Sequence, residues 1–270
     1  MSESPLGRAT EYPVKYAPDL LFPVARNDAR ATLGIGTELP FTGTDLWNAW
    51  ELTWLNADGK PAVATATFVV DATSPNIIES KSLKLYLNSF AMSRFGSADE
   101  ITASIATDLS RIAGSDVAVT VTTAADSTGN SISELPGTCI DGLDMNSSSE
   151  FVDAGLLRCE GGNVKSEELH SHVLRSNCPV TNQPDMGSVL IRYSGQKIDR
   201  SSLLEYIVSF RQHNDFHEAC VERIFLDIKE RCSPEALTVY ARYNRRGGLD
   251  INPFRTDTDE SPENLRLWRQ

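Results

Sequence analysis

The sequence of 270 residues lacks the features of membrane and secreted proteins. Nowhere do about 18 apolar residues follow one another, so we expect no membrane-spanning helix. Residues 1–13 are polar and have no apolar run that could form the core of a signal peptide. The five cysteines form no CxxC pair and are odd in number, which favours free thiols in a reducing compartment. These absences predict a cytoplasmic protein without a membrane partner.

Positive charge is also scarce, because 25 Lys and Arg residues stand against 37 Asp and Glu residues and give a formal net charge of −12. Nucleic-acid affinity depends largely on basic side chains that displace counterions from phosphates, so we expect no direct contact with nucleic acid. A GxGxxG motif is absent as well, since residues 34–36 (GIG) lack the third glycine and the flanking strand and helix. Any nicotinamide cofactor must therefore bind in a non-Rossmann manner.

The composition is that of a globular protein, with 40% hydrophobic and 23% charged residues, and the sequence contains an internal repeat. Residues 79–90 (ESKSLKLYLNSF) and 199–210 (DRSSLLEYIVSF) share five of twelve positions. In both, apolar residues recur at i, i+3, i+4 and i+7, which is one stripe of a helix. We expect each helix to pack against a sheet.

Similar elements surround the two copies. A second helix is expected at 98–112, after the capping-box sequence 97–100 (SADE), and another is expected to begin at 215 or 216. The expected strands are 47–55 and 62–70 with a turn at 56–59, then 117–122, and later 172–180, 188–193 and 237–243. This order predicts an α+β fold of two ββααββ modules, residues 1–135 and 136–270, each with a helix pair on one face of an antiparallel sheet. The polar residues 124–149 would include the linker.

A polar segment, residues 176–187 (SNCPVTNQPDMG), holds the first candidates for chemistry. Asp185 follows Cys178 by seven residues and lies in a predicted turn at 184–187. A hairpin in this segment would bring the thiol and the carboxyl together. The alternatives are a cysteine that is simply a small buried residue and an aspartate that only shapes a turn.

A second constellation follows. His213, His217 and Cys220 are spaced i, i+4 and i+7, which on one continuous helix would offer three zinc ligands on one face. A zinc-dependent hydrolase is therefore an alternative function. His170 and His172 could add a ligand, although a pair of ordinary strand residues is the simpler interpretation.

Two basic segments suggest an anionic ligand. Lys81 lies at a predicted helix start, where the helix dipole disfavours a cation unless an anion binds there. Residues 242–248 (RYNRRGG) place Arg245 and Arg246 beside two glycines, which suits the close approach of a phosphate. A solvated helix end and an ordinary turn are the alternatives.

Four motifs in this order resemble those of the 7-cyano-7-deazaguanine reductases, the QueF family of queuosine biosynthesis: 79–86 (ESKSLKLY), 176–185 (SNCPVTNQPD), 216–218 (FHE) and 245–253 (RRGGLDINP). The resemblance is to the long branch with two tunnelling-fold modules. The first half has 94–96 (RFG) where FHE would fall, and the second has 199–202 (DRSS) in place of ESKS. Each half thus retains what the other has lost, which suggests one active site per chain drawing on both halves. Met186 stands where an aromatic residue is expected.

The resemblance implies that the nitrile of a free deazaguanine base is reduced to a primary amine with two NADPH and no metal. It implies a homodimer, a small-molecule deazapurine substrate, and a covalent thioimide on Cys178. Cys220 is expected to be able to protect Cys178 by a reversible disulfide. A catalytically inactive binding module is the remaining alternative. The implied site residues are Cys178, Asp185 and His217 for catalysis, Ile78, Glu79, Ser80, His217 and Glu218 for the substrate, and Ser80, Lys81, Arg246 and Gly247 for NADPH.

Overall fold

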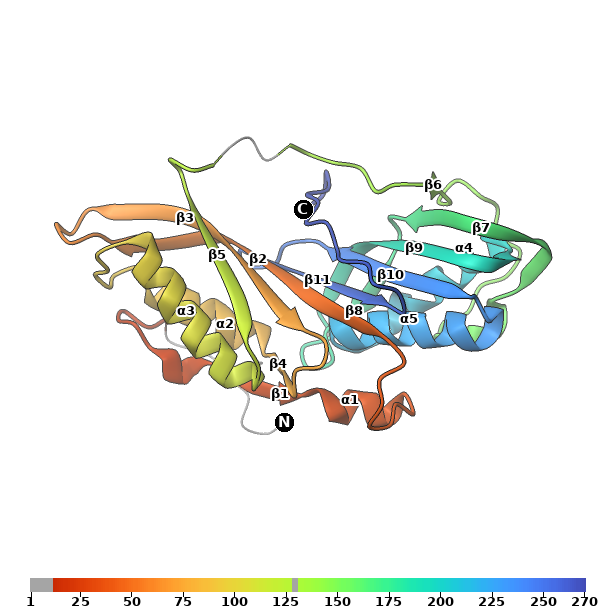
Figure 1. The fold of residues 1–270 in the computed structure, drawn as a ribbon, viewed down its shortest axis with the longest axis horizontal. Coiled ribbons are helices and arrows are strands. Elements are labelled where there is room, and N and C mark those ends of the chain that lie inside the picture. The colour runs from red at the N-terminus through yellow and green to blue at the C-terminus, as the bar shows by residue number, and fades with distance from the viewer. Residues whose placement is uncertain (1–11, 128–130) are drawn as a thin grey trace. The chain divides into compact units, whose positions relative to one another are not determined.

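The computed structural model describes residues 12–127 and 131–270 (Figure 1). These residues form two compact units, of which the first holds 12–36, 45–127, 131 and 245–251, and the second holds 37–44, 132–244 and 252–270. Each unit contains antiparallel strands and a pair of helices, so the α+β class is confirmed. In the described part of the chain, no helix is long and apolar enough to cross a membrane. The predictions for residues 1–13 and for the linker fall partly on 1–11 and 128–130, outside the described residues.

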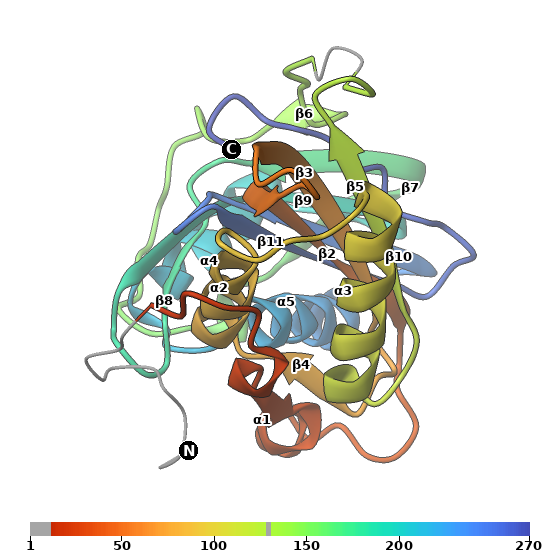
Figure 2. The same ribbon diagram turned by 90° about the vertical axis from the view of Figure 1, so that its left-hand side faces the viewer.

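The first unit is built on strands in the order β5, β3, β2, with bounds Val117–Thr123, Pro61–Asp71 and Thr42–Leu55. The predicted turn between β2 and β3 forms as expected, since Asn56 Oδ1 accepts from the amides of Asp58 and Lys60. Helices α2 (Ser80–Ser89) and α3 (Ala98–Ala113) lie against this sheet (Figure 2). Their common core with the sheet includes Phe68, Leu83 and Ile105, each 0% exposed. Both predicted helices are confirmed.

Smaller elements of the first unit lie next to α2. The short strands β1 (Pro23–Ala25) and β4 (Asn76–Ile78) pair antiparallel, and β4 leads directly into α2. A 3-10 turn, η1 (Pro18–Leu20), and helix α1 (Arg26–Thr32) flank β1. Among the described residues of the predicted module 1–135, β5 is the one strand that follows the helix pair, so the second strand of a full ββααββ order is not found within those residues.

The second unit is built on strands in the order β11, β10, β9, β7, β6. Their bounds are Leu249–Thr256, Ala236–Tyr243, Pro184–Ile198, Cys159–Ser171 and Thr138–Cys139, and β8 (Arg175–Asn177) pairs with β9. The pairing is antiparallel except between β6 and β7. The helical elements are η2 (Ala154–Leu156), α4 (Arg200–Val208), η3 (Ser209–Gln212) and α5 (His217–Cys232). The predicted apolar stripe of α5 is confirmed, because Val221, Ile224, Phe225 and Ile228 are all 0% exposed.

Three predictions in this unit are wrong. The long partner of β9 is β7, upstream of the strand expected at 172–180, and only the short β8 lies inside that range. Residues 184–187 belong to β9 rather than to a turn, because the chain turns at 179–181. Finally, η3 ends at Gln212 and α5 begins at His217, so His213 is not part of α5 and the helical i, i+4, i+7 face does not exist.

The residues shared by the sequence repeat have the same structural roles in both units. Tyr86 donates to Asp108 at 2.7 Å, and Tyr206 donates to Asp227 at 2.6 Å. The Ser82 hydroxyl donates to the carbonyl of Glu79, three residues earlier in the chain. Ser202 does the same with Asp199. Both serine hydroxyls also accept a backbone amide from the segment before the sheet, at Phe22 and Arg158. The identity within the repeat therefore reflects helix anchoring and not the site.

Candidate functional site

Cys178 lies at the end of the β8 and β9 hairpin. Ser176 pairs directly with Asp185, and the ladder continues to Cys178, whose amide donates to the Gln183 carbonyl at 2.9 Å. Side chains of directly paired residues share one face of a sheet, and the residue two positions further along an extended chain returns to that face. The register therefore directs the Cys178 thiol and the Asp185 carboxyl to the same side. Both are buried, with 7% and 5% of their surface exposed.

The start of α5 is attached to this hairpin through the segment before it. The Asn177 amide donates to the His213 carbonyl at 2.8 Å, and the Asp215 amide donates to the Asn177 carbonyl at 3.1 Å. Since α5 begins two residues after Asp215, these bonds fix the position of His217 relative to the hairpin. The structure thus brings the hairpin and the FHE motif together within the second unit.

His217 is held between a carboxyl and an aromatic ring. Its Nε2 lies 3.3 Å from Asp185 Oδ2, and its ring stacks on Tyr243 with centroids 3.8 Å apart and planes inclined by 15°. A carboxylate only accepts, so this contact places the proton of a neutral imidazole on Nε2. Among the described residues, the buried Nδ1 of His217 has no hydrogen-bond partner. An unsatisfied buried nitrogen next to a buried carboxyl is an arrangement that a polar ligand would complete.

Cys220, three residues further along α5, has a different environment from Cys178. It is 0% exposed, and burial raises the pKa of its thiol well above the ordinary value, with Asp215 adding to the shift. The hydroxyls of Ser176 and Tyr243 lie against it and oppose the shift in part. Because the thiolate is the nucleophilic form, Cys220 does not compete with Cys178 as a nucleophile. Both cysteines are free, and the predicted disulfide between them stays a prediction.

The residues of the zinc alternative do not form a metal site. In the described part of the chain, the one group of three His, Cys or acidic side chains close enough to share a metal is elsewhere, at Cys139, His170 and His172. His213 instead lies 3.7 Å from Asp215 through its Nε2. The hydrolase built on His213, His217 and Cys220 thus lacks the geometry it requires.

In the first unit, Glu79 is the N-cap of α2. Its two carboxylate oxygens accept from the amides of Lys81 at 2.8 Å and Ser82 at 2.7 Å, and the residue is 2% exposed. This cap explains why the acidic residue is favoured at the helix start. Asp199 caps α4 in the same way through Ser202. Ile78 is buried in the hydrophobic core, so its backbone rather than its side chain is available to a ligand.

The two glycines after Arg246 form a tight turn in the first unit. Gly247 and Gly248 have φ values of 58° and 75°, and Arg246 and Leu249 exchange backbone hydrogen bonds across them. Two consecutive positive φ angles define the turn type that glycine pairs favour. A Cβ on Gly248 would lie 2.8 Å from the Glu51 carboxyl, and one on Gly247 would lie 3.1 Å from Lys84. Backbone conformation therefore favours glycine at position 248, and a side chain there would also displace the Glu51 carboxyl.

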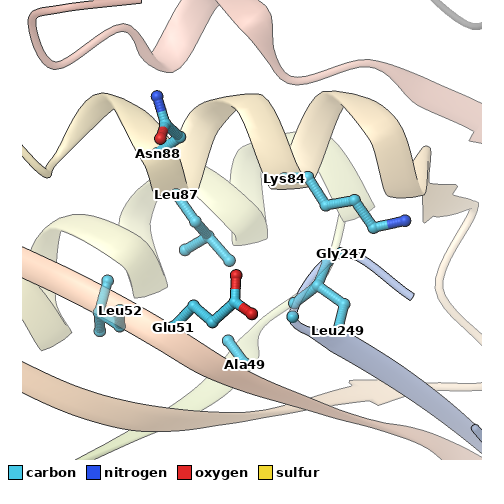
Figure 3. A pocket seen from close by; sticks show the side chains of 9 residues that line it. Ala49, Glu51, Leu52, Lys84, Leu87, Asn88, Gly247 and Leu249 are labelled. Carbon is cyan, nitrogen blue, oxygen red and sulfur yellow. The ribbon is translucent and has the colours of Figure 1, made fainter. Parts of the chain in front are cut away.

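A pocket of the first unit opens beside this turn (Figure 3). Lys84 reaches over it from α2, and Glu51 faces it from β2. Lys84 was missed by the sequence reasoning, although its spacing of three from Lys81 places both on neighbouring positions of one helix face. Its remaining lining residues are Ala49, Leu52, Leu87, Asn88, Gly247, Gly248 and Leu249.

These residues fit an anionic co-substrate such as NADPH. Lys84 lies against Gly247, whose backbone has no side chain to keep a phosphate away. Arg246 precedes the turn, and Lys81 lies one helical turn before Lys84. Ser80 and Lys81 are half-buried at the first turn of α2, where backbone amides also favour anions. The Glu51 carboxylate would repel a phosphate, so the fit depends on the cationic side of the pocket.

A buried thiol on the same sheet face as a carboxyl, which itself contacts an imidazole, is an arrangement that suits covalent catalysis. Comparison with known proteins is more specific. Residues 12–121 match the family described as "Nitrile reductase, 7-cyano-7-deazaguanine-reductase N-term", and residues 184–262 match that described as "QueF-like protein".

Two curated proteins resemble the chain over nearly its whole length. One from Dechloromonas aromatica is 54% identical over 269 residues, covering 99% of this chain and 95% of its own. One from Paraburkholderia phymatum is 52% identical over 270 residues, covering 99% and 98%. Both are named NADPH-dependent 7-cyano-7-deazaguanine reductase. The chain belongs to this family, and the resemblance expected from its four motifs is confirmed.

Proposed function

We propose that this chain is an NADPH-dependent oxidoreductase that reduces the nitrile of 7-cyano-7-deazaguanine to the primary amine of 7-aminomethyl-7-deazaguanine, a step of queuosine biosynthesis. The identity of 52–54% to two reductases over nearly the full chain supports the reaction. The shared face of Cys178 and Asp185, with His217 held at 3.3 Å from that carboxyl, supports the assignment of its catalytic groups.

Cys178 is the proposed nucleophile. Its sulfur attacks the nitrile carbon, the carbon–nitrogen triple bond becomes a double bond, and the nitrogen takes one proton, which gives a thioimide on the enzyme. This covalent step converts a weak electrophile into one that accepts hydride readily. NADPH supplies one hydride in each of two reductions, so two NADPH and two protons are consumed per nitrile. Between the two reductions the carbon–sulfur bond breaks and the Cys178 thiol is restored.

Asp185 and His217 are the proposed proton carriers. As the thiol attacks, its proton has to leave and the nitrile nitrogen has to gain one, and Asp185 shares the face of the sheet to which Cys178 points. His217 can pass a further proton through Nε2, which faces Asp185, or accept a hydrogen bond at its unsatisfied Nδ1. General acid or base catalysis of this kind contributes roughly 10²–10⁴ in rate.

Glu218 and Glu79 are the proposed acceptors for the ring N–H and the exocyclic amine of the deazaguanine, with Ile78 and Ser80 as neighbours. Both carboxyls are buried, at 4% and 2% exposed, which suits a site that excludes water. The cap that Glu79 forms on α2 leaves each oxygen a second lone pair for a ligand. Ser80, Lys81, Arg246 and Gly247 are the proposed NADPH contacts, to which the pocket adds Lys84.

Several parts of the proposal rest on the family resemblance. They are a homodimer, a cytoplasmic location, two tunnelling-fold modules at 1–135 and 136–270, and one active site per chain. The absence of direct nucleic-acid binding rests on the net charge of −12. A free base is a better partner for so acidic a protein than tRNA.

NADPH oxidation with 7-cyano-7-deazaguanine tests the proposed function. We expect two NADPH to be oxidised per nitrile consumed, and no oxidation with Cys178→Ala. Cys159→Ala is a matched control, since this free thiol on β7 is not part of the proposed catalytic site. If folded wild-type protein oxidises no NADPH, the reaction is wrong; full activity in Cys178→Ala would exclude the nucleophile alone.

A further inference from the structure

A second cluster of chemistry-bearing side chains lies where β6 meets β7 in the second unit (Figure 1). We propose that Cys139, His170 and His172 form a zinc site, with the Cys139 thiolate and one nitrogen of each imidazole as ligands and a fourth position open to water. This site is separate from the proposed reduction, in which none of the three residues has a role.

The strand pairing brings the three side chains together. Cys139 is the direct partner of His170 in the parallel pairing of β6 with β7, and the next amide, of Ile140, donates to the His170 carbonyl at 3.0 Å. His170 lies near the end of β7 and His172 in the bend that follows it, and the centroids of their rings are 5.2 Å apart. One ligand atom of each of the three residues lies within 4.8 Å of the other two.

In both imidazoles Nδ1 already has a hydrogen-bond partner, which leaves Nε2 for a metal. Nδ1 of His170 lies 2.9 Å from the Pro136 carbonyl, which can only accept, so Nδ1 carries the hydrogen and Nε2 keeps its lone pair. Nδ1 of His172 lies 2.8 Å from the Ser188 hydroxyl. A hydrogen bond from the second ring nitrogen is the usual way in which proteins orient a metal-binding histidine.

The chain around the cluster is held in place by close packing. Gly137 has a φ of 82°, and a Cβ there would lie 2.1 Å from the Glu168 carbonyl oxygen, so glycine lets β6 approach β7. Asp141 accepts from the Ser171 hydroxyl at 2.6 Å and from the His172 amide at 2.9 Å. These contacts fix the backbone on both sides of the proposed ligands, as a preorganised site requires.

The charges near the cluster are mixed. The Asp141 and Glu134 carboxylates add negative charge near His172, which favours a cation, and Arg269 adds positive charge, which opposes it. Cys139 is exposed, so a metal ion can reach it from solvent and displace its proton. The ligand set itself gives one negative charge once the Cys139 thiol is ionised, and Asp141 adds a second charge near His172.

The ligand types and spacing favour zinc. Two imidazoles and one thiolate are ligands that Zn²⁺ commonly binds, and three protein ligands with one open position form a known zinc arrangement. Tetrahedral Zn²⁺ with bonds of ~2.3 Å to sulfur and ~2.0 Å to nitrogen places its ligand atoms roughly 3.3–3.6 Å apart. From the observed spacing, side-chain shifts of about one ångström would close the site. Bound zinc would tie the two-residue strand β6 to β7.

Metal titration of the full-length protein under reducing conditions tests this site. After removal of metal by a chelator, we expect one Zn²⁺ to bind per chain, and Co²⁺ at the same site to show a thiolate charge-transfer band. Cys139→Ser should abolish that band and weaken Zn²⁺ binding by at least about tenfold, and His172→Ala should weaken it as much. Cys159→Ser removes a thiol from β7, the strand that holds His170, and this variant should bind Zn²⁺ as the wild type does.

Stoichiometric binding that is lost in Cys139→Ser and kept in Cys159→Ser would support the proposal. No stoichiometric binding by folded wild type, or equal binding by wild type and Cys139→Ser, would overturn it. Circular dichroism of each variant shows whether it is folded, and His172→Ala serves as a second test if Cys139→Ser is not. Failure of the reductase assay would not affect these results, because binding alone is measured.

Discussion

At the scale of single residues, the second unit holds two buried thiols, Cys178 and Cys220, in different environments. Cys178 lies at the end of a hairpin on the same face as a carboxyl, whereas Cys220 is enclosed in α5 with a raised pKa. Tyr243 contacts both the ring of His217, the proposed proton carrier, and the thiol of Cys220, whose raised pKa favours the protonated form. We therefore expect Cys178 to be the reactive thiol and Cys220 to be a structural residue of the core.

Asp185→Asn tests the proton-transfer role. The amide is nearly isosteric but cannot take up a proton, so we expect kcat to fall by roughly 10²–10⁴ while the nitrile still binds. Equilibrium binding of 7-cyano-7-deazaguanine and single-turnover rates separate the two effects. Asp215→Asn makes the same change beside His213 and should cause a much smaller loss. A wild-type rate in Asp185→Asn would show that the proton travels by another route.

Part of the site could be predicted at this scale. The sequence indicated Cys178, Asp185, His217 and Glu218 through their motifs, and the structure brings the first three onto one hairpin and the adjoining helix start. The contact of His217 with Asp185 could not be predicted from the sequence. It depends on the register of β8 with β9 and on the backbone hydrogen bonds that residues 213 and 215 form with Asn177. The capping bonds of Glu79 were also not foreseen.

At the scale of elements, the turn after Arg246 shows how backbone conformation serves the proposed NADPH site. Gly248 has a φ of 75°, and a Cβ there would lie 2.8 Å from the Glu51 carboxyl, which would have to shift. We expect Gly248→Ala to lower the free energy of unfolding by about 1–2 kcal/mol, the usual cost of a left-handed conformation in a residue with a side chain. Urea unfolding measures this change.

Gly161→Ala is the matched control for that substitution. Gly161 has open space at its Cβ position and no positive φ, so its replacement should change stability by less than about 0.5 kcal/mol. Equal stability of the two variants would mean that the turn at 247–248 is not constrained as described.

Glu205 on α4 holds the loop at Asn146 and Ser147 through hydrogen bonds. Its environment makes the stability of the protein depend on pH. Burial favours a higher pKa for Glu205, but hydrogen bonds from Asn146 and Ser147 and the charge of Arg158 outweigh it and lower the pKa. A lowered folded-state pKa stabilises the protein above the unfolded-state pKa of about 4.3, and this stabilisation is lost as pH falls through the folded-state value.

Glu205→Gln should therefore be less stable than wild type at neutral pH, and the difference should shrink as the pH falls below about 4. Urea unfolding at a series of pH values measures it. Glu150→Gln changes an exposed carboxyl and should follow the wild type at every pH. A stability difference between Glu205→Gln and wild type that is independent of pH would contradict the role of the Glu205 charge.

The helices were easier to predict than the strands for a physical reason. Both helix pairs have a regular apolar stripe, and α3 and α5 begin within one or two residues of the expected positions. Strand β7 carries mostly exposed polar and charged residues and has register shifts against β9, so no alternation marks it. Its partner β9 was recognised only in part, because Pro184 and Gly187 were interpreted as a turn.

At the scale of the whole molecule, the net charge of −12 bears on how an anionic co-substrate binds. The overall charge repels NADPH, so local cations near the Gly247 turn and the start of α2 have to supply the attraction. Lys81→Ala should raise the KM for NADPH about tenfold or more and leave the KM for the nitrile nearly unchanged, since a charge-assisted contact to phosphate is lost. Steady-state kinetics with each substrate varied in turn measures both constants.

Lys165→Ala provides the control, because Lys165 is an exposed lysine on β7 that lies outside the proposed site. It removes the same charge from the whole molecule and should leave both KM values unchanged. Equal effects of Lys81→Ala and Lys165→Ala would point to overall charge rather than to a contact. An equal rise in both KM values for Lys81→Ala would remove the assignment of Lys81 to NADPH.

The central claim is that the Cys178 thiol adds to the nitrile before any reduction occurs. Mass spectrometry of the intact chain, incubated with 7-cyano-7-deazaguanine in the absence of NADPH, tests it most directly. The account predicts a mass increase equal to one whole nitrile molecule, located on Cys178 by peptide mapping, absent in Cys178→Ala and lost when NADPH is added. An active wild-type protein that forms no such adduct, or an adduct that persists in Cys178→Ala, would contradict it.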